Sequence, residues 1–111
     1  MITTHVLDTA HGRPGSGMHV ELEREQEDGT WALVGGGVTD VDGRLRTLTS
    51  PGQVVPARYR IRFQTGAYFA AQGETGFFPV VEIQFMVVDG SAHYHVPLLL
   101  SPYGFSTYRG S

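Results

Sequence analysis

Arg58-Tyr59-Arg60-Ile61-Arg62-Phe63-Gln64 alternates large apolar side chains with charged ones, with a period of two residues. Successive side chains of an extended chain point to opposite sides, so Tyr59, Ile61 and Phe63 share one face and the arginines share the other. This pattern predicts a half-buried β-strand with a solvated arginine face. The fold class then depends on how often the rest of the chain repeats it.

The same alternation returns in residues 18–23 and 81–88, and residues 31–34 are a plausible partner strand across the Asp28-Gly29 turn. Asp42-Gly43 and Asp89-Gly90 mark two more turns. Only residues 65–72, where alanines lie among aromatics, favour a short helix. Short strands with regularly spaced turns predict an all-β antiparallel sandwich, and we expect residues 1–111 to form a single domain.

Composition narrows the classes of function. The 111 residues are 41% hydrophobic and 17% charged, with a net charge of -3 that offers no basic field for nucleic acid. The absence of cysteine excludes thiolate catalysis and disulfides. No apolar run reaches the roughly 20 residues that span a bilayer. The first residues carry no secretory signal pattern, so we expect a cytoplasmic protein without membrane partners.

The segment that begins at His93 indicates where the chemistry could lie. Its core face is expected to carry Tyr94, Val96, Leu98 and Leu100, and its opposite face His93, His95, Pro97 and Leu99. A half-apolar face with two imidazoles is typical of a cleft or a subunit interface. His5 and Leu7 likewise share a face opposite Val6. If that strand lies beside the His95 strand, histidines from both ends of the chain converge.

Three blocks bracket nearly the whole chain: TTHVLDTA at residues 3–10, DVDGRL at 40–45 and HYHVPLLLSPYGFSTYRGS at 93–111. Together they resemble the 5-hydroxyisourate hydrolases, the transthyretin-related enzymes of urate breakdown. The resemblance implies a transthyretin-like (prealbumin-like) sandwich of two four-stranded sheets with one short helix. It also implies a homotetramer, built as a dimer of dimers, with active sites in the channel between the dimers and no cofactor.

The resemblance further implies hydrolysis of 5-hydroxyisourate to 2-oxo-4-hydroxy-4-carboxy-5-ureidoimidazoline. It assigns catalysis or substrate polarisation to His5, Arg44 and His95, and the C-terminal wall of the site to Tyr108, Arg109, Gly110 and Ser111. An imidazole can take a proton from water that attacks a carbonyl, and a guanidinium can stabilise the resulting oxyanion. Which histidine is the base and which the acid is left open.

Other interpretations of the same residues remain. Without the resemblance, His5 and His95 are more simply strand-edge and surface histidines, and the same holds for His11, His19 and the three arginines of residues 58–64. His93, His95 and His5 could instead bind zinc, or the chain could carry a small planar ligand without turning it over. A calcium loop starting at Asp40 lacks its closing glutamate, since Pro51 occupies that position. No Gly-x-Ser-x-Gly motif supports a serine hydrolase.

Overall fold

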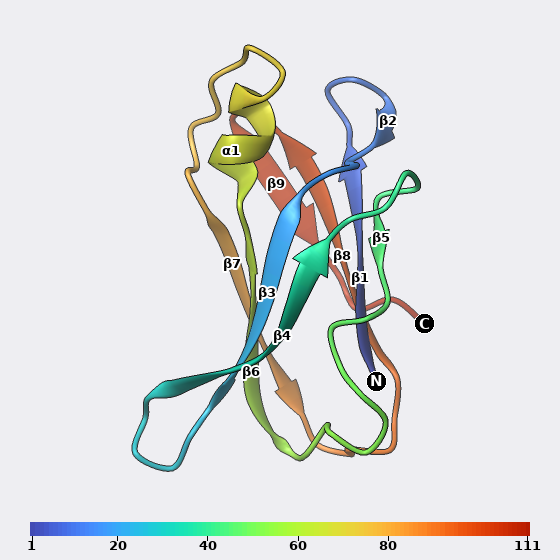
Figure 1. Cartoon of the computed structure of the whole chain (residues 1–111), viewed down its shortest axis with the longest axis vertical. Coiled ribbons are helices and arrows are strands. Elements are labelled where there is room, and N and C mark those ends of the chain that lie inside the picture. The colour runs from blue at the N-terminus through green and yellow to red at the C-terminus, as the bar shows by residue number, and fades with distance from the viewer.

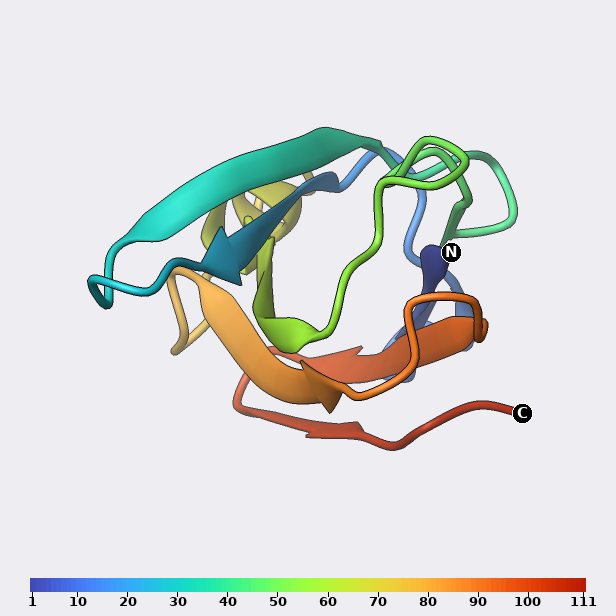
Figure 2. The ribbon, with the colours of Figure 1, turned by 90° about the horizontal axis from the view of Figure 1, so that it is seen from below.

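The computed structural model of the chain describes residues 1–111 as two packed β-sheets and one short helix (Figures 1 and 2). The first sheet has the order β2-β1-β8-β9, with β5 also paired to β1, and the second has the order β4-β3-β6-β7. The elements are β1 (Ile2–Asp8), β2 (Arg13–Pro14), β3 (His19–Glu25), β4 (Trp31–Val38), β5 (Arg44–Leu45), β6 (Ala57–Phe63), α1 (Thr65–Ala70), β7 (Val81–Val87), β8 (Tyr94–Ser101) and β9 (Gly104–Thr107). Seen from below, β4 and β9 lie on opposite outer sides of the sandwich (Figure 2).

The alternating segment predicted from residues 58–64 is the inner strand β6. Tyr59, Ile61 and Phe63 are fully buried in a core cluster of 20 residues, and β6 pairs with β3 on one side and β7 on the other. The arginine face is less free than expected. Arg60 makes a two-pronged contact with Glu23, at 3.0 and 3.2 Å, because paired strands place opposite charges side by side.

The predicted sandwich with one short helix is confirmed, but two details of the first sheet differ from the prediction. β1 and β8 run parallel, and the sheet has five strands rather than four because β2 and β5 add two residues each. Alternation of apolar residues predicts which face a strand buries and carries no information on the direction of its neighbour. The parallel pair joins segments from the two ends of the chain.

Two elements have bounds that differ from those expected. β4 continues four residues beyond the predicted 31–34, through Gly35, Gly36 and Gly37 to Val38. A Cβ on Gly35 would lie 2.0 Å from the carbonyl oxygen of Leu48, so this part of the strand requires glycine for close approach of the two backbones. α1 is shorter than the predicted 65–72 and ends at Ala70. No helix in the structure has the length and apolar character needed to traverse a bilayer.

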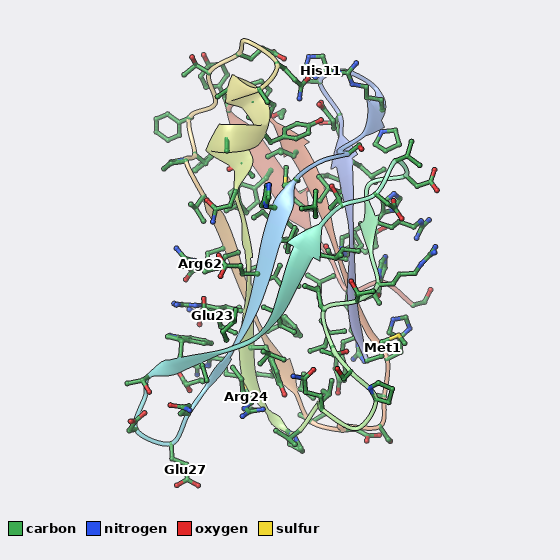
Figure 3. All side chains as sticks on the ribbon, in the orientation of Figure 1. Met1, His11, Glu23, Arg24, Glu27 and Arg62 are labelled. Atoms are coloured by element: carbon green, nitrogen blue, oxygen red, sulfur yellow. The ribbon has the colours of Figure 1, made fainter.

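His11 differs from the free surface residue that the sequence predicted. Its Nδ1 lies 2.8 Å from Asp8 Oδ2 and its Nε2 lies 2.8 Å from Glu74 Oε1, and 28% of its side chain is exposed. Figure 3 places His11 near α1, far from Met1. The interaction ties the loop after β1 to the segment that follows α1. His19 is exposed, as predicted.

Candidate active site

The parallel pairing of β1 with β8 places residues from both ends of the chain on one face of the first sheet. Thr3 is the register partner of His95, and His5 is the register partner of Pro97. Paired residues of neighbouring strands project to the same side, so Thr3, His5 and His95 share a face. β1 therefore does lie beside β8, which was the condition for convergence of the two histidines.

The Asp42-Gly43 turn positions Arg44 beside them. Asp40 Oδ1 accepts hydrogen bonds from the backbone N–H groups of Asp42 and Arg44, each at 2.9 Å. Gly43 adopts φ +76° and its carbonyl accepts a 2.7 Å hydrogen bond from Val6 N–H. This short connection ends in β5, where Arg44 is the register partner of His5.

The same turn also affects the charge of Asp40. Hydrogen bonds from the backbone of Arg44 and Asp42 lower the pKa of Asp40, and the positive charges of Arg46 and Arg44 lower it further.

A cavity of about 220 Å³ opens where these segments meet. Its lining residues are Met1, Thr3, Thr4, Arg44, Arg46, His93, His95 and Ser111. None of them has an acidic side chain, although the whole chain has a net charge of -3. The cavity is smaller than the roughly 300–1,000 Å³ typical of drug-sized ligands, and its two guanidinium groups suit a compact, electron-rich ligand.

The His95 imidazole is held in the cavity wall by a hydrogen bond to Thr3. Its Nδ1 lies 2.8 Å from the hydroxyl of Thr3, and the same hydroxyl lies 2.9 Å from Nε2 of His93. Burial lowers the pKa of His95, and the nearby charges of His93, Arg44 and His5 lower it further. This shift favours the neutral ring, and Nε2 of His95 forms no hydrogen bond within the chain.

The C-terminal residues pack directly on this imidazole. Gly110 N–H donates a 2.8 Å hydrogen bond to the carbonyl oxygen of His95, and the two residues form an isolated antiparallel bridge. A Cβ on Gly110 would lie 2.5 Å from Cδ2 of the His95 ring. The tail thus requires glycine here so that Ser111 can reach the cavity wall.

Tyr108 and Arg109 lie elsewhere. They line a separate hollow of about 230 Å³, together with residues of β7 and β8. The Arg109 guanidinium stacks over the ring of Tyr94 with Cζ 4.6 Å from the ring centroid. In the single chain, therefore, the predicted C-terminal wall of the cavity consists of Ser111, supported by Gly110.

His5 pairs with the lining residue Arg44 but does not itself line the cavity. Its Nε2 donates a 2.9 Å hydrogen bond to the carbonyl oxygen of Asp42, because a carbonyl can only accept. In the neutral ring the unprotonated nitrogen is then Nδ1. This contact fastens β1 to the turn that carries Arg44.

The three histidines are not arranged as a zinc site. The Nε2 atom of His5 is bound to a carbonyl, while His93 and His95 present Nε2 and Nδ1 to one threonine hydroxyl. No group of three His, Cys, Asp or Glu side chains is placed to hold a metal ion. The donor geometry therefore does not support the three-histidine alternative.

Sequence reasoning missed Thr3, Thr4, Arg46 and Met1 as lining residues of the cavity. Thr3 carried a usable signal, because it lies two residues before His5 and so shares its strand face. The partner that gives Thr3 its role lies 92 residues away, and local pattern does not reveal such a pair.

Fold and site together define a class: a transthyretin-like β-sandwich with a basic, histidine-containing cavity where its two chain ends meet. The family model of the HIUase/Transthyretin family matches residues 2–110. The chain belongs to this family.

A 5-hydroxyisourate hydrolase of Salmonella typhimurium is 42% identical over 111 residues, which cover 100% of this chain and 81% of that protein. The structure of Klebsiella pneumoniae 5-hydroxyisourate hydrolase is 38% identical with a TM-score of 0.85, and the match covers 99% of this chain and 98% of that one. Transthyretin from Sparus aurata is 33% identical with a TM-score of 0.93, and the match covers 98% and 95%. The backbone matches both proteins well, so the fold alone does not separate them.

Proposed function

We propose that the chain hydrolyses 5-hydroxyisourate to 2-oxo-4-hydroxy-4-carboxy-5-ureidoimidazoline, a step of urate breakdown. The observation that carries this proposal is that Arg44, His95 and Ser111 line one and the same cavity. The identity of the proposed substrate comes from relatives that are named 5-hydroxyisourate hydrolase. The chemistry of the cavity agrees with that substrate, which is a compact ring system rich in carbonyl groups.

The proposed reaction uses a water molecule as the nucleophile. Nε2 of His95 takes a proton from the water as its oxygen forms a bond to a ring amide carbonyl. Negative charge builds on the carbonyl oxygen, where the permanently charged Arg44 stabilises it. The carbon–nitrogen bond then breaks, and the departing nitrogen takes the proton back from His95, which opens the six-membered ring.

The geometry favours different roles for the two histidines. His95 lines the cavity and has one free ring nitrogen, which suits a base. His5 uses Nε2 to hold the turn that carries Arg44, which suits a residue that positions the guanidinium. Ser111 also lines the cavity and can order the attacking water through its hydroxyl group.

The rival function is a ligand carrier, because sea bream transthyretin in complex with thyroxine shares 33% identity and a TM-score of 0.93. The two functions are separable by turnover. If the chain is the enzyme, replacing His95 with alanine abolishes acceleration while affinity for a stable purine analogue is largely retained. A carrier would bind the analogue and show no acceleration in either form.

We also propose assembly into a homotetramer, as a dimer of dimers. β7 and β9 are unpaired edges of the two sheets, and the hollow that contains Tyr108 and Arg109 lies between them. Open strand edges with exposed apolar residues, here Met86 at 56% and Tyr108 at 57%, are surfaces that pairing with a second copy would cover. Sedimentation equilibrium tests the proposed tetramer by measuring the mass of the assembly.

A cytoplasmic location stays a prediction that cell fractionation can test.

The decisive test of the function follows the ultraviolet decay of 5-hydroxyisourate generated freshly by urate oxidase. The protein should accelerate the decay in proportion to its concentration. Arg44→Gln and His95→Ala should lose most of the acceleration, while His19→Ala, which removes an exposed imidazole outside the cavity, should keep it. Decay at the spontaneous rate with the unaltered protein would refute the proposal.

A further inference from the structure

Thr3 differs from the other threonines near β1 in what its hydroxyl contacts. The hydroxyls of Thr4 and Thr9 donate to the backbone carbonyls of Val96 and Leu100, at 2.6 and 3.0 Å. They join β1 to β8 in the ordinary structural manner. The Thr3 side chain instead contacts only two imidazole nitrogens, although Thr3 is 4% exposed and a structural bond to backbone would satisfy it equally well.

A single hydroxyl hydrogen between two imidazoles couples their protonation. A threonine hydroxyl donates one hydrogen bond and accepts others. If it donates to Nε2 of His93, then Nδ1 of His95 must carry the hydrogen and donate to the hydroxyl oxygen. If it donates to Nδ1 of His95 instead, the hydrogen of neutral His95 is on Nε2. The two arrangements leave opposite ends of the His95 ring available to a ligand.

The charges around the cavity select the first arrangement. Three positive groups line the cavity, the guanidinium groups of Arg44 and Arg46 and the ammonium of Met1, against one carboxylate, that of the Ser111 backbone. An imidazole dipole in such a positive field is more stable with its lone pair toward the cations than with an N–H there. His93 is exposed, so water can satisfy whichever ring nitrogen the hydroxyl does not use.

We propose that Thr3 is a positioning residue that holds neutral His95 with its hydrogen on Nδ1, while His93 accepts the hydrogen of the Thr3 hydroxyl. Nε2 of His95 is then the unprotonated nitrogen that meets the attacking water. This inference rests on the proposed function for the role of His95, but the protonation pattern itself does not. The hydrogen bonds that join Thr3 to His93 and to His95 orient the base. In many hydrolases a carboxylate has this role.

Kinetics of three variants test the proposal. Thr3→Val removes the hydroxyl and keeps the shape, so kcat should fall about 3- to 10-fold, the value of one hydrogen bond, with KM changed less than about twofold. Thr3→Ser keeps the hydroxyl and should retain kcat within about twofold. Thr9→Val is the matched control, because it removes a hydroxyl that bonds only to backbone outside the cavity. The proposal would be overturned if Thr3→Val had the kcat of the unaltered protein, or if Thr3→Ser lost as much kcat as Thr3→Val.

Nitrogen-15 NMR of the His95 ring provides a readout that a packing role would not move. At pH 7.5 the parent and Thr3→Ser should show a protonated Nδ1 and an unprotonated Nε2, and Thr3→Val should show a mixture of both tautomers. A hydrogen on Nε2 in the parent, or an unchanged tautomer in Thr3→Val, would contradict the assignment. If the unaltered protein fails to hydrolyse 5-hydroxyisourate, the proposed function fails, and the NMR result still decides whether Thr3 sets the tautomer.

Discussion

Histidines at the two ends of β1 differ in how completely the fold satisfies them. His11 lies beyond the end of β1, and both of its ring nitrogens meet carboxylates, those of Asp8 and Glu74, at 2.8 Å. His95 lies beside the start of β1, where one nitrogen meets the Thr3 hydroxyl and the other has no partner in the chain. The cluster of His11, Asp8 and Glu74 is closed, because both ring nitrogens have partners, and it contributes to folding. The cluster around His95 is open, because one ring nitrogen is left to bind a ligand.

The charges around the two rings differ in the same sense. Burial raises the pKa of Asp8, but hydrogen bonds from the Tyr68 hydroxyl and from His11 outweigh burial and hold it below its ordinary value. Burial lowers the pKa of His95, and its neighbours His93, Arg44 and His5, which carry or can acquire positive charge, lower it further, with no carboxylate acting in the opposite direction. In the cluster near α1 the carboxylates of Asp8 and Glu74 already have hydrogen-bond partners within the chain, whereas Arg44 and Arg46 line a cavity without acidic side chains, so a ligand can offset their positive charge.

The largest expected difference between the regions concerns catalysis. His95→Ala removes the proposed base, so kcat/KM for 5-hydroxyisourate should fall by about 10²- to 10⁴-fold, the usual contribution of general acid–base catalysis. His11→Ala, the matched change at the other end of β1, should leave kcat/KM within about twofold at a temperature where the variant is folded. Stopped-flow ultraviolet decay measures both, and a large loss in His11→Ala would remove the distinction between open and closed clusters.

Stability should show the reverse order. Asp8→Asn weakens the bonds from His11 and Tyr68 to a carboxylate that is 1% exposed, so the free energy of unfolding should fall by about 1–3 kcal/mol. Urea denaturation followed by circular dichroism measures this. His93→Ala, at an exposed residue of the cavity, should change the free energy of unfolding by less than about 0.5 kcal/mol. Equal losses in both variants would contradict the comparison.

The pH dependence of that stability has a definite sign. The pKa of Asp8 is lower in the folded than in the unfolded chain, so its contribution is complete above the ordinary aspartate pKa and is lost as pH falls through the folded value. Asp8→Asn should therefore cost less stability at pH 3 than at pH 7. Urea titrations of both proteins at the two pH values provide the measurement, and a loss that is equal at both would show that the carboxylate charge has no part in it.

How far the sequence predicts these regions depends on the distance over which each pattern acts. The alternation in residues 58–64 predicted β6, because burial of one strand face is a local property. The family resemblance supplied Arg44 and His95. The role of Thr3 was not predicted, because it depends on the pairing of β1 with β8. The closed cluster of His11 and Asp8 was not predicted either, because residues near α1, about 60 positions away, complete it.

The tail on His95 allows a test of intermediate size. Gly110→Ala places a Cβ 2.5 Å from the His95 ring, so the ring or the tail must shift. Displacing a catalytic group by a fraction of an ångström should lower kcat/KM about tenfold, with little change in melting temperature because the tail is at the surface. The control is Gly104→Ala, where a Cβ would meet only Ser101 at an ordinary 3.7 Å. Unchanged kcat/KM in Gly110→Ala would separate the tail from the base.

The smallest effect concerns the pH profile of the parent protein. The pKa of His95 is lowered from 6.5, so the acid limb of kcat/KM should have its midpoint below pH 6.5 and activity should be lost as the ring gains a proton. Steady-state rates across pH 5 to 8 measure the limb. A midpoint at or above 6.5 would mean that the excess positive charge of the cavity does not act on the base.

Binding of urate, a stable bicyclic analogue of the substrate, tests the central claim most directly. In a titration of nitrogen-15-labelled protein with urate, the account predicts the largest chemical-shift changes at Thr3, Arg44, His95 and Ser111, and none at His11. Shifts confined to the hollow beside Tyr108 and Arg109, or an absence of saturable shifts at Arg44 and His95, would contradict it.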